Sequence, residues 1–516
     1  MSLLLLFIGF ALALACAAGR PACLRHAPWE RVFCVVMLAF IVVPGWRMSF
    51  PQQNVDYDTW LQLARFRHHR IDELFKQHRP VQYYIEYWIV RGMSVVEPDL
   101  RRCSAAMELG ALAAAFLVMV RMRRSLFGSR FMAWPALAIM GYMMTAGGEF
   151  MIDSWNDHLA LEPFYVAGVA WLIGFRASPR RAAYWIAGVF FAESLLHTAE
   201  PWLWSIGLAA ATFKSGKLSK DHKMAIVALF IFMVCTTLAI IRIFPGGSVA
   251  AGDYIAHYSQ KNGPMEALRE YVRGFGRGGF FKLPGRVFLP LCALLLAFLA
   301  LRACYLRKFI HWLWLILSCA ALGFPLIYET SNPERYHAAA LLWALLGARF
   351  AREALARGRL VFRRRSSMAG QAHTSVLSTL RCVSGPVAAY FIAGLFVFGV
   401  AIRIPVVWNS RDEAHVYNQF GEMMAGMLDP RGILAVAPSG SFFLWQEYLF
   451  PGKVMPVKSP ADAVDAARKA AAGQPVYFNA PAAEMLTRAT SATLILVFER
   501  PGDPATPIYE LKGSFK

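Results

Sequence analysis

Long apolar stretches recur along the first 400 residues of the chain, and short polar connections separate them. A helix needs about 20 apolar residues to cross the hydrocarbon core of a bilayer; each stretch could span, although several fall short of that length. The stretches lie near residues 2–18, 32–46, 105–120, 131–147, 160–175, 182–197, 201–213, 224–244, 287–301, 309–327, 337–348 and 383–402. The pattern predicts an α-helical polytopic membrane protein with twelve spans, give or take one, the shorter of which are expected to be tilted or re-entrant.

The connections between these stretches alternate in charge. One set is short and rich in Lys and Arg, and it lies near residues 20–31, 121–130, 176–181, 214–223, 302–308 and 349–381. Because short cytoplasmic loops carry an excess of basic residues, this set is predicted to face the cytoplasm. The other set is then external: residues 47–104, 147–159, 197–202, 245–286, 327–336 and everything after 403.

Composition supports a membrane protein and changes the meaning of the charge. With 57% hydrophobic and 17% charged residues among 516, the chain is too apolar for an ordinary soluble enzyme. A formal net charge of +20 would suggest nucleic acid in a soluble protein, but much of it marks topology here. We therefore expect anionic membrane lipids, and no nucleic acid, among the partners. The nine cysteines show no metal-type or disulfide spacing, and no GxxxxGK phosphate-binding loop is present.

The last hundred residues change character, becoming polar and interrupted by Pro and Gly. Short β-type runs occur at 433–437, 476–479 and 493–498, and helical patterns occur at 460–472 and 481–489. This alternation predicts a small soluble α/β domain on the outer face. The chain thus divides into a membrane domain over 1–405, with large outer loops at 47–104 and 245–286, and an extracytoplasmic domain over 406–516.

The first external loop places two carboxylates, Asp56 and Asp58, just before an amphipathic helical pattern. Trp60, Leu61 and Leu63 could lay that helix on the membrane surface, with Arg65 and its basic neighbours toward headgroups or an anionic ligand. An interfacial helix with an acidic cap and a catalytic carboxylate both remain open for this segment.

A second external group begins at Arg79. A proline follows this arginine directly, and Tyr83 and Tyr84 come three residues later. The planar guanidinium offers a bidentate fork for a phosphate. Contact with lipid headgroups is the alternative explanation.

Acids crowd the mouth of the fifth predicted span, where Asp153 and Asp157 precede Glu162. An ionised group at membrane depth costs about 2.5–3.5 kcal/mol on insertion scales, which favours a functional explanation over simple packing. His197 and Glu200 occupy the next outer turn and could face the same cavity, or they could be ordinary turn residues.

A fourth group is Arg335 with Tyr336, which runs directly into the apolar stretch that follows. Taken alone, this arginine could simply anchor a helix at the interface.

The order and spacing of these groups resemble a known enzyme class. Asp56, Trp60, Ala64 and Arg65 hold the spacing of Asp-(Glu/Ser)-x-x-(Tyr/Phe)-x-x-x-Ala-Arg, with Trp in place of the aromatic Tyr or Phe. Residues 79–84 are similar to (Lys/Arg)-Pro-Pro-Leu-Tyr-Tyr, with Val-Gln in place of Pro-Leu. The chain resembles an integral-membrane glycosyltransferase of the GT-C class, which includes protein O-mannosyltransferases and lipid A aminoarabinose transferases.

The resemblance implies transfer of a sugar from a polyprenyl-phosphate donor to an envelope glycan, lipid or protein, in a bacterial inner membrane. Asp56 would be the general base of an inverting transfer. Arg79 and Arg335 would stabilise the leaving phosphate, with Tyr336 beside them. The other substrate-binding candidates are Asp58, Asp153, Asp157, His197 and Glu200. Class members that use lipid monophosphate donors need no cofactor, so a divalent metal is permitted here and not required.

Two alternatives stay open at the level of the sequence. A transporter or flippase of a lipid-linked or anionic solute would explain twelve spans and charges such as Glu108, Glu193 and Arg242, although no paired halves are visible. A polymerase or ligase acting on polyprenyl-linked glycans would place its chemistry in a large late loop, whereas the acids here lie in the early outer loops.

Overall fold

A computed structural model of the chain describes ten continuous segments and some isolated positions. The segments are residues 80–96, 100–143, 161–196, 219–243, 285–327, 337–367, 426–437, 450–470, 474–499 and 507–512. The isolated positions are 32, 35, 36, 38, 63, 65–67, 69, 207, 210, 266, 269, 423 and 424.

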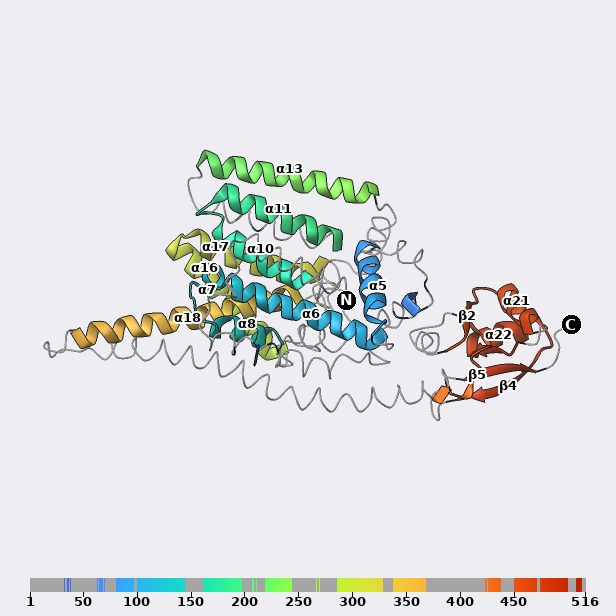
Figure 1. Cartoon of the computed structure of the whole chain (residues 1–516). Coiled ribbons are helices and arrows are strands. Elements are labelled where there is room, and N and C mark those ends of the chain that lie inside the picture. The colour runs from blue at the N-terminus through green and yellow to red at the C-terminus, as the bar shows by residue number, and fades with distance from the viewer. Residues whose placement is uncertain are drawn as a thin grey trace.

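Long helices form a bundle in the part of the chain before residue 368 (Figure 1). They are α6 (Leu100–Arg121), α8 (Ala133–Met143), α10 (Glu162–Gly174), α11 (Pro179–Leu196), α13 (Lys220–Ile243), α16 (Gly285–Leu306), α17 (Phe309–Ile327) and α18 (His337–Ser367). Each overlaps a predicted span, and α18 continues beyond its span through part of the predicted basic connection 349–381. The predicted spans 2–18 and 383–402 lie outside the described residues, and 32–46 and 201–213 lie largely outside them.

The helix α13 shows why these segments suit a bilayer. Its stretch Lys220–Ile240 has 21 residues and a mean hydropathy of 2.3. Among the described helices, it alone is both long enough and apolar enough by itself to cross a membrane. At 1.5 Å per residue it is about 31 Å long, which matches the hydrocarbon core. Val227, Phe230 and Ile231 are more than half exposed on its outer side, as expected for contact with lipid chains.

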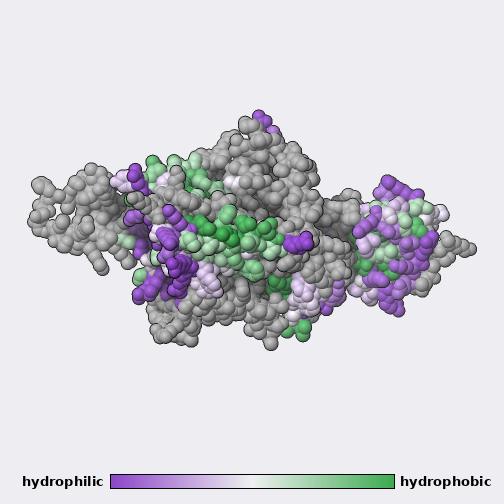
Figure 2. Space-filling model, turned by 90° about the horizontal axis from the view of Figure 1, so that it is seen from above, coloured by the Kyte–Doolittle hydropathy of each residue, from purple (hydrophilic) through white to green (hydrophobic). Residues whose placement is uncertain are grey.

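The basic connections share one end of the bundle, called here the basic end and defined by the turns 122–132, 175–178 and 307–308. Hydrophobic residues cover the middle of the bundle, and hydrophilic residues gather at this end (Figure 2). The C-terminal strands lie beyond the opposite end, called the sheet end (Figure 1). The predicted alternation of connections between two sides is therefore confirmed for the described helices.

Ion pairs fix the basic end of α18. Glu353 accepts hydrogen bonds from Arg302 of α16 and, at 3.2 Å, from Arg349 Nε on its own helix. Arg352 Nη2 donates at 2.7 Å to the carbonyl of Gly128, which ends α7 (Arg123–Phe127) with a φ of 63°. Glycine suits that left-handed cap because it has no Cβ. These contacts join α18 to α16 and to the connection between α6 and α8.

The helix α5 (Pro80–Met93) lies across the bundle rather than along it (Figure 1). Proline is favoured at the first turn of a helix, where its missing N–H costs nothing. The sequence prediction of an aromatic helix starting after Arg79 is confirmed.

The C-terminal residues form a five-stranded mixed sheet with two helices. The strands are β1 (Ile433–Val436), β2 (Lys453–Pro456), β3 (Val476–Asn479), β4 (Thr493–Phe498) and β5 (Ile508–Lys512), in the order β2-β1-β3-β5-β4. β1 pairs in parallel with β2 and β3, whereas β5 pairs antiparallel with β3 and β4. The predicted strands β1, β3 and β4 are confirmed, and the sequence reading missed β2 and β5.

The helices α21 (Pro460–Ala470) and α22 (Ala480–Ala489) match the two predicted helical patterns and share one apolar core with the sheet. Small residues such as Ala463, Ala466 and Ala482 are fully buried there, which lets the helices approach the strands closely. A second cluster contains Leu434 and Tyr477 of the sheet together with apolar residues of α5 and of the start of α6.

Asn479 joins this sheet to α22, and its substitution gives a stability test. Its Oδ1 accepts from the backbone N–H groups of Ala437 at 3.0 Å and Ala482 at 3.2 Å, and its Nδ2 donates to the Ala437 carbonyl at 3.1 Å. Asn479→Ala removes a helix cap and leaves buried backbone groups unpaired, which should lower the free energy of unfolding by about 2–4 kcal/mol.

Proteolysis of the full-length protein in increasing urea would measure the effect, with cleavage after the exposed Arg488 of α22 as the signal. Asn479→Asp is a second test: it keeps the capping oxygen but places a buried carboxylate oxygen against the Ala437 carbonyl, so its midpoint should also fall below that of the wild type. Equal urea midpoints for wild type and Asn479→Ala would contradict this role.

Candidate functional site

The nine residues that the sequence nominates for the site all lie outside the described residues. They are Asp56, Asp58, Arg79, Asp153, Asp157, His197, Glu200, Arg335 and Tyr336. Their roles therefore stay predictions. The structure describes the helix ends that lie next to several of them in the sequence.

Those helix ends belong to one side of the bundle. α8 ends at Met143 and α10 begins at Glu162, so the two helices flank the segment that carries Asp153 and Asp157. α11 ends one residue before His197, and α18 begins one residue after Tyr336. Because the basic connections lie at the other ends of these helices, all four ends point toward the sheet end. The topology thus gathers the attachment points of the predicted groups at one end of the bundle.

Three of these helix ends meet at one buried carboxylate. Glu162 Oε1 accepts a hydrogen bond from the Tyr142 hydroxyl of α8 at 2.9 Å, and it lies 2.9 Å from His337 Nδ1 at the first residue of α18. Since an ionised carboxylate only accepts, the imidazole is the donor. Tyr165 of α10 stacks on the His337 ring with centroids 5.5 Å apart. We call Tyr142, Glu162 and His337 the carboxylate junction.

Burial makes the carboxylate junction energetically important. Glu162 is 0% exposed and His337 is 1% exposed. Removing one partner of a buried hydrogen bond typically costs about 1–3 kcal/mol, and more where the remaining group is charged, because that group stays desolvated and unpaired. The sequence singled out Glu162 as an acid at a span mouth, but it gave no signal that Tyr142 or His337 would bind it.

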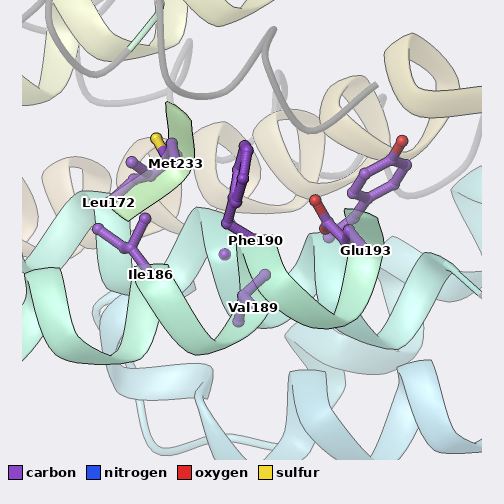
Figure 3. A pocket seen from close by; sticks show the side chains of 8 residues that line it. Leu172, Ile186, Val189, Phe190, Glu193 and Met233 are labelled. Carbon is purple, nitrogen blue, oxygen red and sulfur yellow. The ribbon is translucent and has the colours of Figure 1, made fainter. Parts of the chain in front are cut away.

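A narrow cavity lies next to the carboxylate junction, between α10, α11 and α13 (Figure 3). Its empty volume, including space open to the outside, is about 280 Å³. Leu172, Ile186 and Met233 surround one part of it, and Glu193 lies at the other, three residues before the end of α11 (Figure 3). Tyr165, which stacks on His337, lines the same cavity. Glu193 and the aromatic ring that stacks on His337 therefore line the same cavity.

The described part of residues 63–69 packs against α5. The Phe66 and Tyr87 rings meet edge to face at 5.7 Å, and His69 Nδ1 lies 2.8 Å from the Tyr87 hydroxyl. Leu63 is 0% exposed and Arg65 is 8% exposed. The expectation that Leu63 faces lipid is wrong, because an amphipathic pattern equally suits packing on the apolar side of another helix. Arg65 does not face the membrane surface either, and an anionic ligand for it stays a prediction.

Within the described segments, no group of three or more His, Cys, Asp or Glu side chains is placed to hold a metal ion. The predicted acids at 56, 153 and 157 lie outside those segments.

The contact of His69 with Tyr87 can be tested by hydrogen exchange. Tyr87→Phe removes one partly buried hydrogen bond, worth about 1 kcal/mol, so amide exchange at residues 63–69 should accelerate roughly fivefold. Tyr184→Phe, at an exposed position of α11, is the matched control and should leave this segment unchanged. Unaltered exchange at 63–69 in Tyr87→Phe would show that the hydrogen bond does not hold this segment.

Comparison with known proteins identifies the fold. No protein-family model and no curated protein sequence matches the chain. The crystal structure of ArnT from Cupriavidus metallidurans bound to undecaprenyl phosphate aligns over 94% of this chain and 98% of that one, with 12% identity and a TM-score of 0.56. The apo state of the same protein aligns over 93% and 98%, with 12% identity and a TM-score of 0.54. The chain therefore has the polytopic membrane fold of the GT-C glycosyltransferases, the class that its motifs resemble.

Proposed function

We propose that this protein transfers a sugar from a polyprenyl-phosphate donor to an envelope acceptor on the outer face of the membrane. The observation that carries the proposal is the convergence of helix ends at the sheet end of a GT-C fold. Every described helix end that adjoins a predicted donor or acceptor residue lies there. ArnT, whose fold is similar, was crystallised with undecaprenyl phosphate, and we infer a donor lipid of the same kind here.

The proposed chemistry assigns one task to each predicted group. In an inverting transfer the acceptor hydroxyl loses its proton as it attacks the anomeric carbon, and Asp56 is the proposed base. The leaving lipid phosphate gains negative charge, which Arg79 and Arg335 would stabilise as fixed cations. Asp58, Asp153, Asp157, His197, Glu200 and Tyr336 are proposed to hold the sugar or the acceptor.

Topology supports an extracytoplasmic site. The basic connections share the end of the bundle opposite the C-terminal sheet (Figure 1), and the positive-inside rule places basic loops in the cytoplasm. The sheet end then faces outward, with the domain proposed for residues 406–516 in the periplasm of a bacterial cell. A donor held in the outer leaflet of the inner membrane could reach this end of the bundle from the side.

The base assignment predicts the behaviour of Asp56→Asn. The amide cannot take up a proton, so kcat should fall by about 10²–10⁴-fold, while the protein still inserts in the membrane. The measurement is transfer of radiolabelled sugar from polyprenyl phosphate to envelope acceptors in membranes, with protein amount checked by immunoblot.

Asp221→Asn is the matched control for that experiment. Asp221 pairs with Arg180 at 2.8 Å at the basic end, where both side chains are more than half exposed, so its loss should leave transfer unchanged. Full transfer by Asp56→Asn would exclude this residue as the base. Absence of transfer by the wild type, together with movement of a lipid-linked solute across vesicles, would favour the transporter instead.

The proposal of a metal-independent reaction predicts the effect of chelation. If the arginines alone stabilise the leaving phosphate, extensive EDTA treatment should leave the transfer rate within about twofold of the untreated rate. The assay uses the same membranes, and magnesium or manganese is added back as the control. A loss of about tenfold or more that either ion restores would show that the acids at 56, 153 or 157 hold a metal.

A further inference from the structure

The carboxylate junction connects helix ends that are distant in the sequence. Tyr142 lies 20 residues before Glu162, and His337 lies 175 residues after it. Residues 143–161 lie between Tyr142 and Glu162 in the sequence, so the hydrogen bond joins the end of α8 to the start of α10. The contact with His337 then attaches the first residue of α18 to the same point.

Short stretches of chain link this junction to predicted site residues. Arg335 and Tyr336 directly precede His337, and two residues of extended chain span at most about 7 Å. Asp157 precedes Glu162 by five residues, which limits its reach to about 18 Å. A displacement of the first residue of α18 would therefore move the backbone that carries Arg335.

Stability alone does not explain why a polar junction is buried at this point of the bundle. Well-packed apolar residues of similar volume are often as stabilising as a buried ion pair, or more so. A carboxylate differs because its hydrogen bonds have direction, so one oxygen with two donors fixes the relative positions of three helix ends. The stack of Tyr165 on the His337 ring fixes the plane of the imidazole as well.

We propose that Glu162 is a positioning residue for donor binding: by holding Tyr142 and His337, it sets the start of α18 and with it the placement of Arg335 and Tyr336. This inference rests on the proposed function, in which those two residues meet the lipid phosphate. Glu162 itself touches no substrate in this scheme.

The other end of α18 provides a matched control. Glu353 is also held by two partners, Arg302 and Arg349, and Glu353→Gln removes a carboxylate from the same helix. Sixteen residues of helix separate Glu353 from His337, a rise of about 24 Å. Glu353→Gln should therefore lower thermal stability without changing donor binding.

The experiment measures the Kd for undecaprenyl phosphate and the donor KM and kcat in full-length protein in nanodiscs. Glu162→Gln and His337→Gln should each raise the Kd and the donor KM by about tenfold and leave kcat within about threefold. The acceptor KM should not change. Tyr142→Phe keeps the contact with His337 and should raise the Kd by about threefold, which provides a mild variant if the others fail to fold.

The double variant Glu162→Gln with His337→Gln gives a further readout that a general loss of stability would not produce. If both residues act through one contact, the Kd of the double variant should equal the Kd of the single variant that binds undecaprenyl phosphate less tightly. If the two residues act independently, their effects should multiply, and the Kd should rise by about a hundredfold. An unchanged Kd in every junction variant, or an equal rise in Glu353→Gln, would overturn the positioning role. A wild type that transfers no sugar would overturn the proposed function instead.

Discussion

The arrangement of α18 depends on one physical constraint: burying a carboxylate in an apolar bundle is costly unless hydrogen-bond donors meet it there. Oε1 of the buried Glu162 lies against Tyr142 and His337 at the sheet end, and the partly buried Glu353 accepts from two arginines at the basic end. Apolar contacts between helices are non-directional, so they allow α18 to slide or rotate along its neighbours. The two carboxylates restrict that freedom, because each has at least one partner on another helix.

Much of the fold follows from periodicity and length. The apolar stretches predict the bundle helices because a spanning helix needs a long apolar run, and the Ala-rich pattern over 460–472 predicts α21 because its apolar face repeats with a helical period. The strands β2 and β5 are different. β2 has four residues, begins with Lys and ends with Pro, and β5 alternates only weakly, so neither shows an apolar run of strand type. Their pairing depends on the neighbouring strands β1, β3 and β4.

The contacts within the candidate site are harder to predict from the sequence than the helices are, for a physical reason. A pattern reports which residue types are unusual at membrane depth, and it singled out Glu162 on that basis. It does not report which residues meet, since the contact between Glu162 and His337 joins positions 175 apart. The same limit explains why the burial of Leu63 and Arg65 in the protein was not predicted. An apolar stripe on a helix does not show whether lipid or another helix covers it. The nine predicted site residues stay predictions.

This chain and ArnT have similar folds at 12% sequence identity, so most positions of the bundle accept different residues. Most bundle positions need only an apolar side chain of suitable size, because lipid tails and helix cores impose similar demands, so these residues can change freely. A fold therefore does not determine a reaction. Specific chemistry requires polar groups held in fixed directions, and burying them in the bundle is expensive. The buried contacts among Tyr142, Glu162 and His337 at the sheet end are of this directional kind, whereas the apolar contacts around them are not.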